Sequence, residues 1–127
     1  MEVALDTGAL AEFAAGNENL GRVLAPYRSI ALPATVLGEY RYGLMGSRQE
    51  ARLNEWLAEL LAYAHVLETK ARTSAVYAKI RHQLRVKGKP MPENDVWIAA
   101  AAMEHDLPLL TRDAHFRNVN GLEVLGW

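Results

Sequence analysis

The chain has 127 residues, half of them hydrophobic, which is sufficient for a single domain with a substantial core. Its formal net charge of −1 argues against bulk electrostatic coating of nucleic acid, and the absence of cysteine excludes disulfide scaffolds and thiolate metal sites. No apolar run reaches the roughly 20 residues of a membrane helix and the N-terminus shows no signal-peptide pattern, so we expect one cytoplasmic domain over residues 1–127 with no membrane segment.

The N-terminal part of the chain predicts a strand followed by two helices. Val3–Leu5 is a short apolar run, typical of a buried strand, and it ends at Asp6. Gly8 and the small residues after it open a helical stretch. Residues 17–27 (NENLGRVLAPY) are expected to form a second short helix.

The middle of the chain continues this alternation. Ser29–Leu32 is a second strand candidate. The helix expected over residues 33–45 starts with Pro33, which suits a first turn because proline lacks the N–H that a first turn leaves unpaired. Leucines at helical spacing predict an amphipathic helix over residues 49–64, and His65–Leu67 is a third strand candidate.

The C-terminal part adds two helices and two strands. Thr69 is a suitable N-cap for a helix whose apolar residues recur on one face. The next helix opens at Asn94 or at the prolines before it and extends through Met103; its four consecutive alanines leave almost no polar face, so we expect it to be buried on most sides. Further strands are expected at Leu109–Leu110 and Leu122–Leu125.

Strands that alternate with helices predict an α/β fold with a mostly parallel sheet covered on both faces. This pattern also decides how to interpret Asp6-Thr7-Gly8, which matches the active-site tripeptide of aspartic proteases. Those enzymes are almost wholly β and hold the tripeptide in a loop between strands. A chain this rich in helices does not build that site.

Four carboxylates are expected at one edge of the predicted sheet. In open α/β sheets ligands bind at the carboxyl ends of strands, and Asp6 and Asp113 follow the first and fourth predicted strands. Glu39 lies early in the helix after the second strand, and Asp95 lies in the first turn of the alanine-rich helix. Taken singly, each acid is more simply explained as a cap, a turn residue or a solvated side chain, so only their convergence indicates a site.

Converging carboxylates repel one another and need a cation between them. With oxygen ligands, no cysteine and no paired histidine spacing for zinc, the fitting ions are Mg²⁺ and Mn²⁺. These ions lower the pKa of a bound water and stabilise the charge that builds on a phosphate during in-line attack. Together with a basic stretch nearby, such a site indicates hydrolysis of a phosphodiester.

The basic stretch at residues 79–89 is a candidate RNA contact, although such a run is more often a solvated helix face. Trp97 has apolar neighbours, which favours a core position over a base-stacking platform, and His115 is interpreted as a structural or surface residue rather than a general base. The candidate RNA-contact residues are Arg81, Arg85, Lys87, Lys89 and Arg112.

Four segments together resemble PIN-domain ribonucleases, and specifically the VapC-type toxins of bacterial and archaeal toxin–antitoxin pairs. The segments are LDT at 5–7, GEYRYGL at 38–44, NDVWIAAAAM at 94–103 and LLTRDAHFRNVNGLEV at 109–124. The last two, in this order, are the most specific, and the resemblance covers the whole chain. It implies a PIN-like three-layer α/β/α sandwich around a mostly parallel sheet of about four or five strands.

The resemblance also implies a set of site residues. The acids, which in the family bind one or two Mg²⁺ or Mn²⁺ ions and direct water at an RNA phosphodiester, match Asp6, Glu39, Asp95 and Asp113. The polar residues that orient these acids and their waters match Thr7, Asn94 and Thr111. The family usually has Asn where this chain has Gly8, so one side-chain amide near the site is missing. Because all four acids are intact, we expect activity to survive.

The resemblance further implies partners in addition to the RNA substrate. Toxins of this type are usually homodimers, and a small VapB-type antitoxin covers the acidic pocket, often with a basic residue inserted into it. An arginine suits a metal-free carboxylate cluster because it forms bidentate hydrogen bonds. The leucine content of the helices at 33–45 and 49–64 leads to the hypothesis that a groove between them accepts an apolar antitoxin segment.

Two other functions remain as alternatives. The first is a phosphoacceptor module in which one strand-end aspartate is phosphorylated; such sites usually need a lysine at another strand end, and Arg112 and Asp113 stand there instead. The second is a non-catalytic module whose acidic pocket only receives a basic peptide from a partner. The intact set of four acids favours the nuclease over both.

Overall fold

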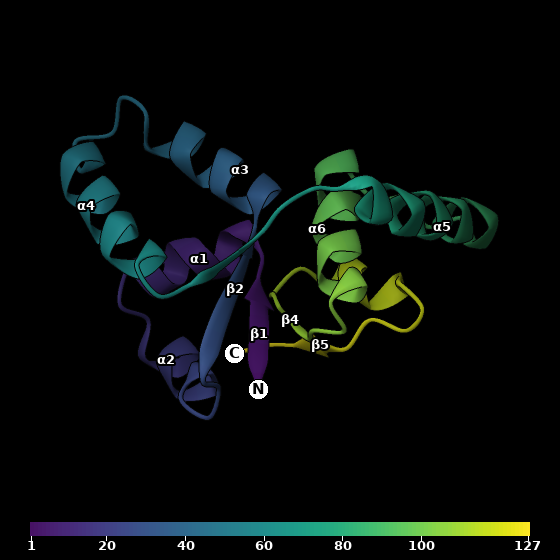
Figure 1. The fold of residues 1–127 in the computed structure, drawn as a ribbon, viewed down its shortest axis with the longest axis horizontal. Coiled ribbons are helices and arrows are strands. Elements are labelled where there is room, and N and C mark those ends of the chain that lie inside the picture. Colours follow the sequence, from purple (N-terminus) through teal and green to yellow (C-terminus); the bar gives the residue numbers. More distant parts are fainter.

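A parallel sheet of five strands forms the centre of the computed structural model, which describes residues 1–127 (Figure 1). All neighbouring strands are parallel, and their order is β3-β2-β1-β4-β5. Val3, Ala4 and Leu5 of the central strand are fully buried, as expected for a strand covered on both faces. The strands are β1 (Glu2–Leu5), β2 (Ser29–Pro33), β3 (His65–Leu67), β4 (Leu109–Leu110) and β5 (Val124–Leu125).

Six α-helices cover the two faces of the sheet. Crossovers between parallel strands are right-handed, and the connections from β1 to β2 and from β2 to β3 step across the sheet in one direction, whereas that from β3 to β4 steps back. The first four helices therefore cover one face and the last two the other, as Figure 1 shows. This confirms the predicted α/β/α sandwich. The helices are α1 (Thr7–Ala14), α2 (Glu18–Leu24), α3 (Ala34–Leu44), α4 (Glu50–Leu61), α5 (Ala71–Lys87) and α6 (Glu93–Glu104).

The reversal of direction occurs between β1 and β4. The chain leaves β1 toward the face covered by α1 and leaves β4 toward the opposite face. In such sheets a crevice opens at the carboxyl ends of the two strands that flank this switch point. Asp6 follows β1 directly and Thr111 follows β4 directly, so the topology places both residues at the rim of the crevice.

Helix α6 is the most deeply buried helix, as its sequence predicts. Ile98 and the alanines 99–102 are at most 5% exposed, and the small side chains allow the helix to lie close to its neighbours. The longer α5 packs on α6, and its Ile80 and Leu84 are buried. None of the helices is both long enough and apolar enough to cross a lipid bilayer.

Three local predictions differ from the structure. Thr69 is not an N-cap: α5 begins two residues later, and the amide N–H of Lys70 donates to Oγ1 of Thr73 at 3.0 Å. The last strand is only two residues long, because Leu122 still belongs to the turn before it. A short 3₁₀ helix, Ala114–Asn118, was not predicted; it anchors Phe116 in the core.

Candidate active site

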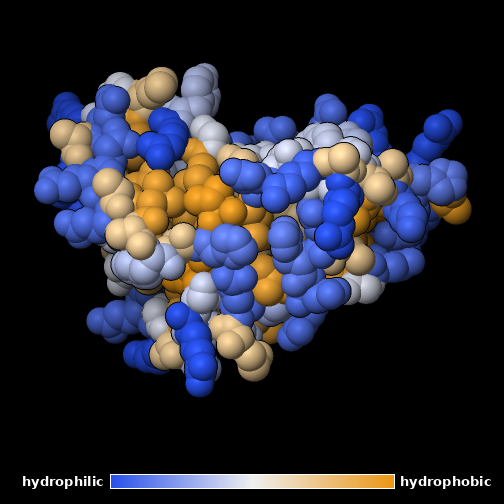
Figure 2. Space-filling model, in the orientation of Figure 1, coloured by the Kyte–Doolittle hydropathy of each residue, from blue (hydrophilic) through white to orange (hydrophobic).

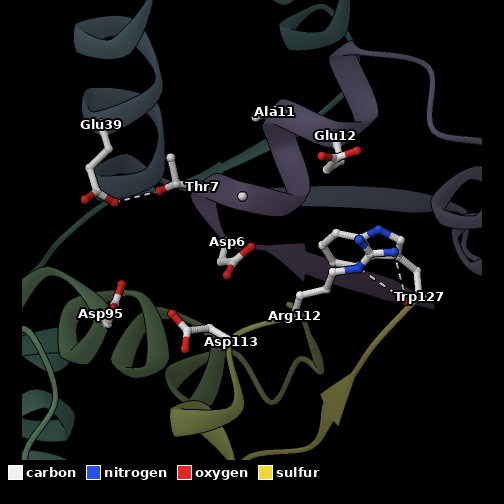
Figure 3. A pocket seen from close by; sticks show the side chains of 10 residues that line it. Asp6, Thr7, Ala11, Glu12, Glu39, Asp95, Arg112, Asp113 and Trp127 are labelled. Carbon is white, nitrogen blue, oxygen red and sulfur yellow. Dashed lines mark hydrogen bonds between the residues drawn. The ribbon is translucent and has the colours of Figure 1, made fainter.

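The four predicted acids line one open pocket at the switch point. Its volume is about 610 Å³, and in Figure 3 the carboxylates of Asp6, Glu39, Asp95 and Asp113 surround a common space. They come from the end of β1, from α3, from the first turn of α6 and from the segment after β4. Each of these residues follows the carboxyl end of a strand or lies near one. Residues that are far apart in the sequence are therefore neighbours in the pocket.

Asp6 has both carboxylate oxygens bonded within the protein. It is the N-cap of α1, where Oδ1 accepts the amide N–H of Ala9 at 2.8 Å. Oδ2 accepts the hydroxyl of Thr111 at 2.5 Å, and the same hydroxyl oxygen accepts the amide N–H of Asp113 at 2.9 Å. Thr111 thus connects the two acids that follow β1 and β4, and its orienting role stays a prediction.

Glu39 is oriented by the other two predicted polar residues. The hydroxyl of Thr7 donates to Oε1 at 2.6 Å, and Nδ2 of Asn94 donates to Oε2 at 3.3 Å. Gly8 also lines the pocket, and a Cβ there would meet only Oδ1 of Asp6 at 3.7 Å, an ordinary contact. The pocket is therefore open where the family usually has Asn, and the amide that contacts an acid here is that of Asn94.

His115 lies between two of the acids, although the sequence pattern favoured a structural or surface position. Its Nε2 is 2.9 Å from Oδ2 of Asp95, and its Nδ1 is 3.1 Å from Oδ1 of Asp113. Nε2 is buried and has no aligned hydrogen-bond partner. One ligand atom from each of the three residues lies within 4.8 Å of the other two, which is close enough for all three to bind one ion.

The electrostatics of the pocket disfavour its negative charges. Burial raises the pKa of Asp6 above the ordinary aspartate value, the charges of Asp113 and Glu39 add to this effect, and the hydrogen bonds from Thr111 and Ala9 oppose it. Burial likewise raises the pKa of Asp95; Glu39 and Asp113 contribute in the same direction, and His115 opposes them. A cation bound among these acids would offset both the burial of the carboxylates and the repulsion between them.

Of the predicted RNA contacts, the structure brings only Arg112 into the pocket. Arg81 and Arg85 are exposed on α5, away from the pocket; Arg81 donates to the hydroxyl of Tyr77 at 2.6 Å. Nζ of Lys87 donates to the main-chain oxygen of Asn118 at 2.9 Å, and Lys89 is exposed in the following loop. Contact between these α5 residues and RNA stays a prediction.

Three residues of the site were missed by sequence reasoning. Glu12 lines the pocket one helical turn beyond Gly8, and this i, i+4 spacing on the helix after Asp6 is a signal for it. His115 lies two residues after Asp113 in the 3₁₀ helix, which no pattern in the sequence predicted. Trp127 lines the pocket beside Arg112 because β5 pairs with β4, which no local pattern indicates.

The residues present fit a divalent cation. Asp95, Asp113 and His115 offer two carboxylates and an imidazole within 4.8 Å of one another, and Nε2 of His115 lacks an aligned partner in the protein. Such mixed oxygen and nitrogen ligands suit Mn²⁺ and, with the carboxylates alone, Mg²⁺. No lysine and no cysteine lines the pocket.

The fold and the site together define a doubly wound α/β protein with a carboxylate-rich pocket at its switch point. The chain belongs to the PIN domain family, whose model matches residues 3–122.

Two relatives are similar to this protein over most of the chain. Ribonuclease VapC2 of Rickettsia felis is 26% identical over 106 residues, which are 83% of this chain and 79% of the relative. Ribonuclease VapC5 of Mycobacterium tuberculosis is 29% identical over 119 residues, 92% of this chain and 87% of the relative.

Solved structures are similar over the entire fold. The complex VapBC2 of Rickettsia felis, bound to a DNA fragment from its promoter, contains a chain with a TM-score of 0.87 and 24% identity, covering 100% of this chain and 99% of that one. VapBC-5 of Mycobacterium tuberculosis, a member of the VapBC family of toxin–antitoxin systems, gives a TM-score of 0.76 at 26% identity, with 98% and 96% covered.

Proposed function

We propose that this protein is a metal-dependent endoribonuclease that hydrolyses RNA phosphodiester bonds and acts as the toxin of a toxin–antitoxin pair. The observation that carries this proposal is the convergence of Asp6, Glu39, Asp95 and Asp113 on one pocket of a PIN domain. Two relatives at 26% and 29% identity are ribonucleases by name, which supports RNA as the substrate.

In this proposal the four acids hold Mg²⁺ or Mn²⁺. When bound, the ion supplies a nucleophile from water at neutral pH and stabilises charge on the phosphate. Asp95, Asp113 and His115 would hold it, because one ligand atom of each lies within 4.8 Å of the other two. Thr111 holds Asp6 in one rotamer, while Thr7 and Asn94 hold Glu39, so the carboxylates need little reorganisation when substrate arrives.

The test uses Asp6→Asn and Asp95→Asn with Asp106→Asn as the matched control. Asn at position 6 still caps α1, so the fold is retained. Asp106 is exposed outside the acidic pocket at a φ of 53°, which Asn tolerates. Purified proteins are incubated with total RNA in Mg²⁺ or Mn²⁺, with and without chelator, and cleavage ends are mapped.

We expect the wild type and Asp106→Asn to cut, and chelator or either site substitution to abolish cutting. Full activity of Asp6→Asn or Asp95→Asn, or cleavage that is insensitive to chelator, contradicts the proposal. A phosphoacceptor role is disfavoured because both oxygens of Asp6 are already hydrogen-bonded and because Arg112 is the only cation in the pocket.

A second, apolar groove supports the proposed antitoxin. Its volume is about 310 Å³, and it lies between α1, α3 and α4, where Figure 2 shows hydrophobic residues exposed. Leu44 and Leu53 line it, and Thr7 and Glu39 belong to both this groove and the acidic pocket. A segment seated in the groove would therefore reach the acids directly. The groove thus involves α1 in addition to the two helices that the sequence suggested.

We expect Leu53→Asp to weaken binding of the cognate VapB-type antitoxin, because a charge in the groove loses solvation on complex formation. Ala58→Asp is the control, since Ala58 is exposed on the same helix outside the groove. Equal affinities in calorimetric titration would place the antitoxin elsewhere.

We also propose a homodimer, supported by the exposed side chains of Tyr42 (78%) and Met45 (71%) at the end of α3. Light scattering of the isolated protein tests it, and a monomeric mass contradicts it.

A further inference from the structure

The acidic pocket contains a single cation. Arg112 lines the pocket together with five carboxylates, those of the four predicted acids and of Glu12. Its hydrogen bonds do not go to any of them: Nε and Nη2 both donate to the main-chain oxygen of Trp127 at 3.3 Å. An exposed arginine beside so many acids would ordinarily pair with one of them, so a specific contact holds it away.

That contact is made by both the main chain and the ring of Trp127. The guanidinium carbon of Arg112 lies 4.5 Å from the centroid of the indole ring, a cation–π geometry that also restricts the side chain. In the view of Figure 3 the pair lies on one side of Asp6, opposite Glu39. The guanidinium is thus held at the rim of the pocket, on the side opposite Glu39.

The sheet explains why these two residues meet. Strands β4 and β5 are parallel, with Leu109 paired to Val124 and Leu110 to Leu125. The pairing continues past the strands, because the amide N–H of Thr111 donates to the oxygen of Leu125 at 2.9 Å. Two further residues along each segment are Arg112 and Trp127. The last strand of the sheet therefore delivers the indole to the arginine.

We propose that Arg112 binds a backbone phosphate of the RNA next to the bond that is cut, and that Trp127 is a positioning residue that presents it. This inference rests on the proposed ribonuclease function. An arginine has five N–H donors, and two are used by Trp127, so the remainder are free for the bidentate contact that guanidinium groups make with phosphate. A fixed cation here also reduces the repulsion between the acids and an incoming phosphate.

The indole nitrogen indicates that Trp127 is not held by its own hydrogen bond. Nε1 is buried and has no partner, which is unfavourable for a donor. The ring packs against the hydrophobic core, and its contact at the rim of the pocket is with the guanidinium of Arg112. A residue that acts only through Arg112 should have no effect once Arg112 is removed, and this is what separates a positioning role from direct contact with RNA.

The experiment is a double-mutant cycle with Arg112→Ala, Trp127→Ala and the double variant. The variant Trp127→Phe tests whether another aromatic ring restores binding. The control is Arg22→Ala, because Arg22 is exposed on α2 outside the pocket. Binding of a labelled mixed-sequence single-stranded RNA is measured by fluorescence polarisation in Ca²⁺, and kcat and KM are measured in Mn²⁺ at the cleavage sites mapped in total RNA. We expect Arg112→Ala to weaken binding and raise KM about tenfold or more, as for loss of a charged hydrogen bond. Trp127→Ala should act in the same direction, Trp127→Phe should retain most of the affinity, and the double variant should match Arg112→Ala.

The inference is overturned if Arg112→Ala binds RNA as the wild type does, or if the double variant loses clearly more than Arg112→Ala, which would mean that Trp127 contacts RNA itself. Wild-type protein that binds RNA but does not cut it overturns the proposed hydrolysis and leaves the phosphate contact to be judged by binding alone. Wild-type protein that neither binds nor cuts overturns both. Thermal unfolding of each variant shows whether a loss of binding is a loss of fold.

Discussion

At the scale of single residues, Thr111 is the group on which the geometry of the site depends most. Its hydroxyl donates to Asp6 and accepts from the amide of Asp113, so one oxygen atom sets the relative position of two acids from opposite ends of the chain. Asp6 in turn is both an N-cap and a site residue. A residue that looks like an ordinary cap in the sequence is therefore part of the pocket, because the cap and the crevice occupy the same strand end.

We expect Thr111→Val to destabilise the fold by about 1–3 kcal/mol, because it leaves a buried carboxylate oxygen without its donor and an amide N–H without its acceptor. The pKa of Asp6 should rise further, since the Thr111 hydrogen bond lowers it. Urea denaturation measures the free energy of unfolding. Thr69→Val is the control, because Thr69 is exposed before α5; equal losses in the two variants would show that the hydroxyl of Thr111 contributes nothing specific.

The raised pKa values of Asp6 and Asp95 predict a pH dependence of stability in metal-free protein. Each folded-state pKa lies above the 3.8 of an unperturbed aspartate, so the folded state binds protons more tightly than the unfolded chain. The resulting stabilisation is complete below pH 3.8 and is lost as the pH rises through the folded-state values. Because other acids also titrate, the difference between wild type and Asp6→Asn is the quantity to measure.

The free energy of unfolding of the wild type relative to that of Asp6→Asn should fall as the pH rises above 3.8 in chelator-treated samples, as urea denaturation will show. A difference that stays constant as the pH rises would mean that the carboxylate of Asp6 is not disfavoured in the folded state.

At the scale of elements, α6 combines two functions. Its first turn carries Asp95 into the pocket and Asn94 to Glu39, and most of the helix that follows is a buried stretch of small side chains. Close packing of the alanines against α5 and the sheet fixes the helix along its axis. The position of Asp95 relative to Asp6 therefore depends on side chains that make no contact with the pocket.

We expect Ala100→Leu to destabilise the fold by about 1–3 kcal/mol, because a fully buried alanine has no space for three more carbon atoms. Ala78→Leu on the exposed side of α5 serves as control and should be nearly neutral. Denaturation curves give the stability. A neutral Ala100→Leu would show that α6 is free to shift on the sheet.

At the scale of the whole molecule, the strand order creates the site. Reversal of the crossover direction between β1 and β4 opens the crevice, and the segments after these strands supply Asp6 and Asp113 to its rim. An ion bound at this point would contact residues from the end of β1 to the segment after β4, so it would stabilise the entire fold.

We therefore expect Mn²⁺ to raise the temperature of unfolding of the wild type. A free ion concentration of a hundred times Kd corresponds to about 2.7 kcal/mol. Asp95→Asn should remove most of this effect and Asp106→Asn none of it, with ion binding checked by calorimetry. Stabilisation that is unchanged in Asp95→Asn would place the ion outside the acidic pocket.

The hydrophobic pattern alone determined the order of strands and helices along the chain, because this order depends on periodicity within short segments. It also placed Asp6 and Asp113 after strands, Asp95 in a first helical turn and Glu39 further along its helix. Local hydrogen bonding changed details that periodicity does not report, such as the start of α5 at Ala71 rather than near Thr69. Only the tertiary structure decided that His115 lies between Asp95 and Asp113 and that Trp127 holds Arg112. The second arrangement depends on the pairing of β4 with β5, and the first on the position of the 3₁₀ helix beside the first turn of α6. Both are contacts between segments that no single stretch of sequence contains.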